Sequence, residues 1–195
     1  NRTDCKMANI NNNFYFQNTY LTPMEVRNHL REWILNQETE FNKTAWFGKA
    51  GYFLLTMKFI APERKANGRK IPDNNILSNF EKFYIKILPK VVCQNYYKHK
   101  DKQPRGIAYV DRPLKTNEID PTNHIHAIVV THPHLTSRFI RTMPEMKRIA
   151  ANMNIQMEDF DVIEITKTPS RAFDYIAKAS LKKTLDYPYI MLPAL

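Results

Sequence analysis

The sequence predicts an α+β domain in which an antiparallel sheet carries its helices largely on one face. The chain has 195 residues, and its apolar fraction of 43% and charged fraction of 25% are those of a globular protein. From residue 51 onward, the segments follow the order strand, helix, strand, strand, helix, strand, helix. The two successive strands in the middle are close enough in the sequence to form an antiparallel hairpin.

Residues 1–50 are predicted to form an N-terminal arm and a helix that pack on the core. The first 20 residues are rich in Asn and end in a run of aromatic residues. Thr22 and Pro23 are typical of a helix start, with Thr as the N-cap and Pro at the first helical position. Apolar residues then recur at helical spacing, which predicts a helix over residues 23–40.

Residues 51–195 are predicted to form the main domain. Alternation, apolar periodicity and the positions of prolines define its elements. They are a strand over residues 51–60, a helix over 76–88 that Pro89 ends or kinks, strands over 106–111 and 124–130, a helix from 136 to about 153 with Pro144 near its middle, a strand over 161–166 and a helix from 169 to about 183.

The charge of the chain indicates an anionic partner. Lys and Arg number 29 against 19 Asp and Glu, so the formal net charge is +10, and nucleic acid is the first candidate. Basic residues cluster after the first strand (Lys58, Arg64, Lys65, Arg69, Lys70), before the hairpin (Lys98, Lys100, Lys102, Arg105) and on the helix after it (Arg138, Arg141, Lys147, Arg148). Tyr96, Tyr97 and Tyr109 are candidates for stacking on exposed bases.

Several protein classes are excluded or disfavoured by composition. With 4 Gly and no Gly-rich phosphate motif, a P-loop or dinucleotide-binding fold is not expected. Cys5 and Cys93 give neither a disulfide framework nor a metal-binding spacing. No apolar run is long enough to cross a membrane. These features predict an intracellular protein with no membrane partner.

Two histidines form a candidate metal site. His124 and His126 stand two apart on a predicted strand, so both imidazoles project from one face and can bind a divalent cation. The alternative is a strand on which two histidines happen to occur. A hairpin centred near residues 118–119 would place Asp111 opposite His126, about 5 Å away at Cβ. Glu118, Asp120 and Glu164 are the other candidates for a third ligand. Imidazole and carboxylate ligands together suit Mn²⁺ or Mg²⁺.

The last predicted helix carries a candidate nucleophile. At about 100° per residue, Arg171, Lys178 and Lys182 fall within about 60° of Tyr175. The opposite side holds Phe173, Ile176, Ala177 and Leu181. Tyr175 therefore lies on the basic face, where neighbouring cations favour the nucleophilic phenolate form. A surface tyrosine among solvated lysines is the alternative. With a metal on the non-bridging phosphate oxygens and lysines nearby, such a phenol can attack a phosphodiester in line.

Three motifs together resemble the HUH endonuclease superfamily, specifically the single-tyrosine Rep proteins that initiate rolling-circle replication. They occur in the family's order, each on the expected kind of element. They are FLLTM at residues 53–57, HIH at 124–126 and YIAK at 175–178. The likeness extends upstream of the third motif to residue 163, including Lys167 and Ser170, and covers roughly residues 50–185.

The resemblance implies an RRM-like or ferredoxin-like palm with flanking helices, in which residues 51–195 are the nuclease domain. It implies nicking and joining of single-stranded DNA at an origin hairpin, through a 5′-phosphotyrosine on Tyr175 assisted by Lys178. It implies Mn²⁺ or Mg²⁺ on His124, His126 and Asp111, and DNA contacts from Thr56, Lys58, Arg171 and Lys182. Host replication helicase and polymerase would be partners, in a prokaryotic cytoplasm or, for a viral protein, the host nucleus. The long basic segment between the first two motifs departs from the family pattern.

Two other functions fit the same residues. A relaxase or single-tyrosine transposase would use the same palm and nucleophile. A non-catalytic RRM-like nucleic-acid-binding module would carry the histidine pair incidentally. Tyr175→Phe separates the enzymes from the module, because only an enzyme loses a covalent adduct.

Overall fold

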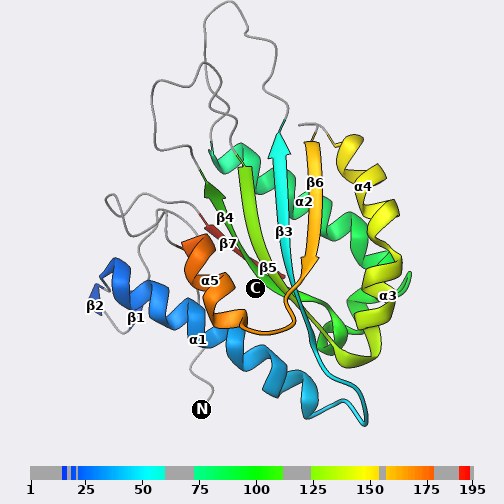
Figure 1. Ribbon diagram of the computed structural model, residues 1–195, viewed down its shortest axis with the longest axis horizontal. Helices are drawn as coiled ribbons and strands as arrows, with labels where there is room; N and C mark the ends of the chain where they lie inside the picture. Colours follow the sequence, from blue (N-terminus) through cyan, green and yellow to red (C-terminus); the bar gives the residue numbers. More distant parts are fainter. Residues whose placement is uncertain are drawn as a thin grey trace, which may run out of the picture.

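A single antiparallel sheet forms the centre of the computed structural model (Figure 1). The structure describes residues 15–16, 19–20, 22–59, 73–111, 124–153, 157–177 and 189–193. The strand order is β6 (Met157–Glu164), β3 (Gly51–Phe59), β5 (His124–Thr131), β4 (Arg105–Asp111) and β7 (Tyr189–Leu192). Every neighbouring pair in this order is antiparallel, which confirms the predicted α+β class and the β4–β5 hairpin.

Five α-helices surround the sheet in the described part of the chain. They are α1 (Pro23–Asn42), α2 (Asp73–Val91), α3 (Thr136–Arg141), α4 (Met143–Ala151) and α5 (Pro169–Ala177). The short 3₁₀ helices are η1 (Tyr96–Lys98), η2 (Lys100–Lys102) and η3 (Pro133–Leu135). A separate two-stranded ribbon pairs β1 (Tyr15–Phe16) with β2 (Thr19–Tyr20).

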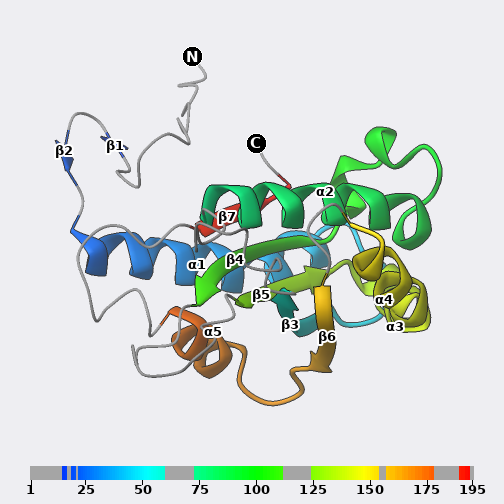
Figure 2. The same cartoon turned by 90° about the horizontal axis from the view of Figure 1, so that it is seen from above.

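The helices cover both faces of the sheet, so the prediction that they lie largely on one face is wrong. Figure 2 shows α2 and α5 on opposite sides of the sheet. The physical reason is that the central strands carry apolar side chains on both faces of the sheet. Leu55 and Met57 pack in the core on one face, and Tyr52 and Leu54 pack in the core on the other. A sheet that is apolar on both faces must be covered on both.

Each face has its own hydrophobic core. On the first face, α2 and α3 bury Phe80, Phe83 and Phe139 against the sheet, and α4 buries Met146. The rings of Phe53 and Phe139 are in contact, with centroids 4.6 Å apart. On the second face, α1 and α5 bury Ile34 and Phe173 against β4 and β5. The second core fixes α5 over the strand that carries the histidine pair.

Several predicted boundaries move. Pro144 separates the predicted helix over 136–153 into α3 and α4, and it lies in the first turn of α4, where its missing N–H is not needed. Helix α2 continues past Pro89 to Val91. Strand β6 begins at Met157 and ends at Glu164, earlier than the predicted strand over 161–166. Strand β7 was not predicted at all.

His132 is fully buried where β5 ends. Its Nδ1 accepts the His134 backbone N–H at 3.2 Å, and its Nε2 lies 3.3 Å from the Thr44 hydroxyl oxygen. An imidazole that accepts at Nδ1 carries its proton on Nε2 and is neutral. Burial lowers the pKa of His132 below the usual histidine range, and the nearby His134 and Lys102 lower it further.

We expect the free energy of unfolding to fall as the pH drops below about 6.5, because His132 takes up a proton there in the unfolded chain but not in the folded one. His132→Gln should reduce this pH dependence by at most about 1.4 kcal/mol per pH unit. Urea unfolding at about pH 7.5 and about pH 5.5 measures the change. His29→Gln, on an exposed part of α1, is the control. Equal pH dependence in both variants would contradict the assignment.

Candidate active site

The histidine pair lies in a polar lattice on the sheet face that α1 and α5 share. In the strand register, His126 pairs with Thr56 and Tyr109, while His124 pairs with Lys58 and Asp111. On β6, Asp161 pairs with Thr56 and Asp159 with Lys58. Two adjacent rows of residues therefore cross strands β6, β3, β5 and β4. The first row is Asp161, Thr56, His126 and Tyr109, and the second row is Asp159, Lys58, His124 and Asp111. Thr56 and Lys58 share one face of β3, and this face is the one that carries both histidines.

The predicted partner of Asp111 is wrong by two residues along β5. Asp111 lies opposite His124, not His126, because the hairpin is centred one residue earlier than expected. Its backbone position still adjoins the histidine pair. The side chain of Asp111, together with Glu118 and Asp120, lies outside the described residues.

Glu164 is excluded as a third ligand by the register of β6. It pairs with Phe53, whose side chain is in the core on the opposite face of the sheet. Side chains alternate between faces along a strand, so Glu164 points away from His124 and His126. Glu164 was a candidate only if its strand ran beside the histidine strand, whereas β6 is adjacent to β3 and not to β5.

The histidines have the chemistry of a partial metal site. Their ring centroids are 6.0 Å apart, and His126 is buried with its Nδ1 3.2 Å from the Thr56 hydroxyl oxygen. Metal-binding imidazoles commonly use their second nitrogen in such a hydrogen bond, which orients the ring. Among side chains the structure describes, no group of three or more His, Cys, Asp or Glu is close enough to hold an ion. Two imidazoles beside the Asp111 position fit a divalent cation by donor type.

Helix α5 brings Tyr175 to the histidines. The side chains of Phe173, Ile176 and Ala177 are buried, whereas Tyr175 is 61% exposed, so the predicted separation of the two helix faces is confirmed for these residues. The ring centroid of Tyr175 lies 5.8 Å from that of His126, with an interplanar angle of 71°. A solvent-accessible phenol and a buried imidazole are therefore adjacent.

Two contacts hold α5 in this place. Phe173 packs edge-on against Tyr109, with ring centroids 6.3 Å apart, and Tyr109 is the cross-strand neighbour of His126. On the outer side, Arg27 of α1 donates to the Asp174 carboxylate at 2.8 Å. Phe173 and Asp174, the two residues before Tyr175 in the helix, thus position it.

Tyr109 is a structural residue, so its predicted role in base stacking is wrong. Only 4% of it is exposed, because it lies beneath α5 and beside Tyr189 at 5.7 Å. Burial raises the pKa of Tyr109, which keeps its phenol neutral. Of the two tyrosines next to His126, Tyr175 is the one whose side chain is exposed to solvent.

The other predicted residues divide into two groups. Thr56 and Lys58 are partly buried in the lattice, and Arg171 is exposed on α5, one turn before Tyr175. Lys178 and Lys182 lie outside the described residues, as do Arg64, Lys65, Arg69 and Lys70.

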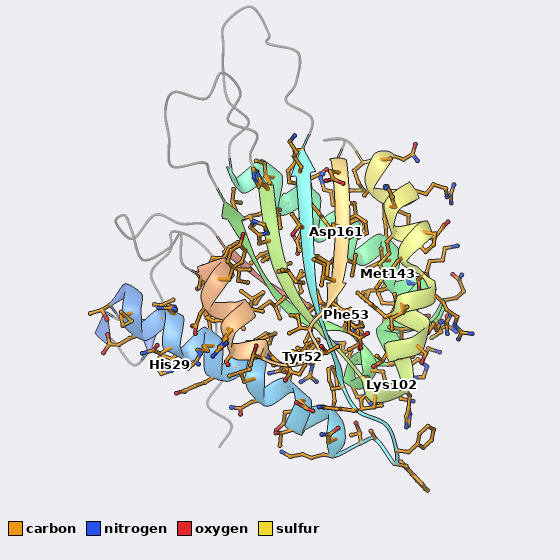
Figure 3. All side chains as sticks on the ribbon, in the orientation of Figure 1. His29, Tyr52, Phe53, Lys102, Met143 and Asp161 are labelled. Atoms are coloured by element: carbon orange, nitrogen blue, oxygen red, sulfur yellow. The ribbon has the colours of Figure 1, made fainter. Side chains whose placement is uncertain are left out.

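Asp159 and Asp161 are site residues that sequence reasoning missed. Both are exposed on β6, the edge strand of the sheet, and Figure 3 shows Asp161 there. Asp159, Phe160 and Asp161 repeat the polar–apolar–polar alternation of the histidine motif, and this signal could have identified them. They add negative charge to the side of the lattice away from Asp111.

Phe173→Ala should destabilise the fold by about 3–5 kcal/mol, because it removes a fully buried ring from the core under α5. Tyr175→Ala, two residues away on the exposed face, should change stability by less than about 0.5 kcal/mol. Urea unfolding of the two variants measures the difference. Equal losses would mean that α5 is not seated as described.

Comparisons with known proteins give no match to a protein family, to a curated protein or to a solved structure. None of the helices in the described ranges is both long and apolar enough to cross a lipid bilayer.

Proposed function

We propose that the chain is a metal-dependent endonuclease that nicks and rejoins single-stranded DNA through Tyr175 and so initiates rolling-circle replication. The observation that carries the proposal is the contact of Tyr175 with His126, at 5.8 Å between ring centroids, beside a second histidine on the same strand face. Phenol and paired imidazoles come from segments 49 residues apart, between positions 126 and 175. Tyr-dependent, metal-assisted transesterification requires a phenol and metal-binding imidazoles to lie close together.

The architecture supports a ferredoxin-like or RRM-like palm. Strands β6, β3, β5 and β4 are adjacent in that order, and α2 and the α3–α4 pair connect them over one face. This is the arrangement of two interleaved βαβ units. Helices α1 and α5 and strand β7 would be additions to the palm, and α5 would supply the nucleophile.

In the proposed reaction, the Tyr175 oxygen attacks the phosphorus of a DNA phosphodiester, and the bond between that phosphorus and the 3′ oxygen of the upstream nucleotide breaks. The phenol proton passes to solvent, and the departing oxygen takes up a proton to become a 3′-OH. DNA is left joined to Tyr175 through its 5′ phosphate. Attack of a 3′-OH on this linkage breaks the tyrosyl bond and rejoins the strand.

His124, His126 and Asp111 would hold Mn²⁺ or Mg²⁺. When bound, such an ion withdraws charge from the non-bridging oxygens of the phosphate. The Thr56 hydroxyl orients the His126 ring for this task. Around the site, Lys58, Arg171, Lys178 and Lys182 would neutralise phosphates, and their contribution to binding would weaken with salt.

The proposed substrate is single-stranded DNA at an origin hairpin, with the host replication helicase and polymerase as later partners in an intracellular setting. Incubation with random single-stranded oligonucleotides and Mn²⁺, followed by a denaturing gel, tests the activity. A 3′-labelled strand should become protein-linked, and a 5′-labelled strand should be shortened. Chelation should abolish both products, and Mn²⁺ should restore them. Bound but uncut DNA would instead indicate a non-catalytic binding module.

A further inference from the structure

The turn between α1 and β3 projects two adjacent aromatic side chains into solvent. Trp46 is 93% exposed and Phe47 is 75% exposed, more than any other large hydrophobic residue in the described ranges. Neighbouring exposed aromatics of this size are typical of a binding surface. Neither residue has a part in the candidate active site.

The aromatic pair stands on an anchored turn. The ring of Phe47 lies against that of His134, with centroids 4.7 Å apart and a tilt of 33°. Gly48 has a φ of 92°, and a Cβ there would be 3.2 Å from the Pro133 Cβ, so the turn is seated closely on η3. The hydrogen bond between Thr44 and His132 ties the start of the turn to the same place. Trp46 is therefore exposed because of the backbone conformation of an anchored turn.

The surroundings of the aromatic pair are strongly basic. Segments 43–50 and 96–102 contain the cations Lys43, Lys49, Lys98, Lys100 and Lys102 and the single acid Asp101, and Lys43 forms an ion pair with Glu40 of α1 at 2.6 Å. His132 is hydrogen-bonded to Thr44 of the first segment, and the charge of Lys102 in the second segment lowers the pKa of His132. Figure 3 places Lys102 toward the end of the molecule from which β3 starts.

This combination favours single-stranded nucleic acid over a protein partner. Aromatic rings beside a positively charged surface are the usual means of binding single strands, because bases stack on the rings while lysines contact phosphates. Protein interfaces are depleted in lysine at their core, whereas Lys43 and Lys49 lie three residues before and after Trp46 in the sequence. The net charge of +10 agrees with an anionic ligand.

We propose that Trp46 and Phe47 form a second binding site for single-stranded DNA, in which the two rings stack on bases away from the nicked phosphodiester. The turn precedes Gly51, which pairs with Thr131 at the far end of β5 from His124. From His126 to Thr131 the strand spans about 17 Å, so the two sites are separate. The choice of DNA as the ligand rests on the proposed function.

The test uses the Tyr175→Phe background, in which DNA binds without reacting. A double variant, Trp46→Ala with Phe47→Ala, should bind an oligonucleotide of about 20 nucleotides at least about 5-fold and up to about 150-fold more weakly. Ile85→Ala, which truncates an exposed apolar side chain on α2, is the matched control and should leave affinity unchanged. Circular dichroism should show an unchanged fold, since both aromatics are exposed.

A fluorescence measurement gives an independent readout. The chain has 2 Trp, so Trp33→Phe leaves Trp46 as the only indole, and DNA should quench its emission. Unchanged affinity in the double variant, or no quenching of Trp46, would overturn the proposal. If the unaltered chain self-associates and the double variant does not, while DNA affinity stays the same, the aromatic pair is a protein interface and the proposal is overturned. Absence of a Tyr175 adduct in the unaltered chain would refute the nuclease but not this binding site.

Discussion

Replacing Tyr175 by Phe abolishes the covalent protein–DNA adduct and leaves affinity for single-stranded DNA within about twofold of the unaltered chain. This result is expected because the substitution removes the attacking oxygen only. The phenyl ring can keep its contact with His126, and the residue is exposed, so the helix loses no core packing. Denaturing gels measure the adduct, and fluorescence anisotropy in chelator measures the affinity.

Tyr97→Phe is the matched control for Tyr175→Phe. Tyr97 is also an exposed tyrosine, at 57%, but it lies on η1 outside the candidate active site. This variant should form the adduct at the normal rate. An adduct that survives in Tyr175→Phe would assign the nucleophile to another residue, and loss of adduct in both variants would point to a general effect of tyrosine removal.

His126→Ala should eliminate cleavage at every Mn²⁺ concentration, because it removes one of the two imidazoles and leaves at most one beside the Asp111 position. Thr56→Val should have a milder effect. It removes the hydroxyl 3.2 Å from the His126 Nδ1, and loss of such an orienting contact typically costs about 10–100-fold in metal affinity. Cleavage by Thr56→Val should therefore recover when Mn²⁺ is raised.

The Mn²⁺ dependence of the initial cleavage rate measures both effects. His29→Ala is the control, since His29 is exposed on α1 and lies outside the lattice. Its Mn²⁺ dependence should equal that of the unaltered chain. Activity of His126→Ala in the presence of chelator would remove the histidine pair from the mechanism.

Local periodicity was sufficient to predict the faces of individual elements. His124 and His126 share a strand face because side chains alternate along β5, and the same rule places Thr56 with Lys58 on β3. On α5, helical spacing separated Tyr175 from the buried Phe173 and Ile176. These relations depend only on the backbone geometry of one element, so the sequence of that element determines them.

Relations between elements could not be predicted in the same way. The register of the hairpin, which places Asp111 opposite His124, depends on how residues 112–123 connect the strands, and no local pattern specifies it. The covering of both sheet faces depends on where α1 packs relative to strands that follow it in the chain. Trp46 and Phe47 are residues that a sequence pattern would assign to a core, and only the packed structure reveals their exposure.

The contact between Tyr175 and the histidine pair is tested most directly by locating the covalent bond. The unaltered chain is incubated with single-stranded DNA and Mn²⁺, digested with nuclease and protease, and its nucleotide-modified peptides are sequenced by mass spectrometry. We expect a 5′-phosphonucleotide on Tyr175, with none formed in chelator. A modification on a different residue, or no modified peptide although the DNA is cut, would contradict the proposed mechanism.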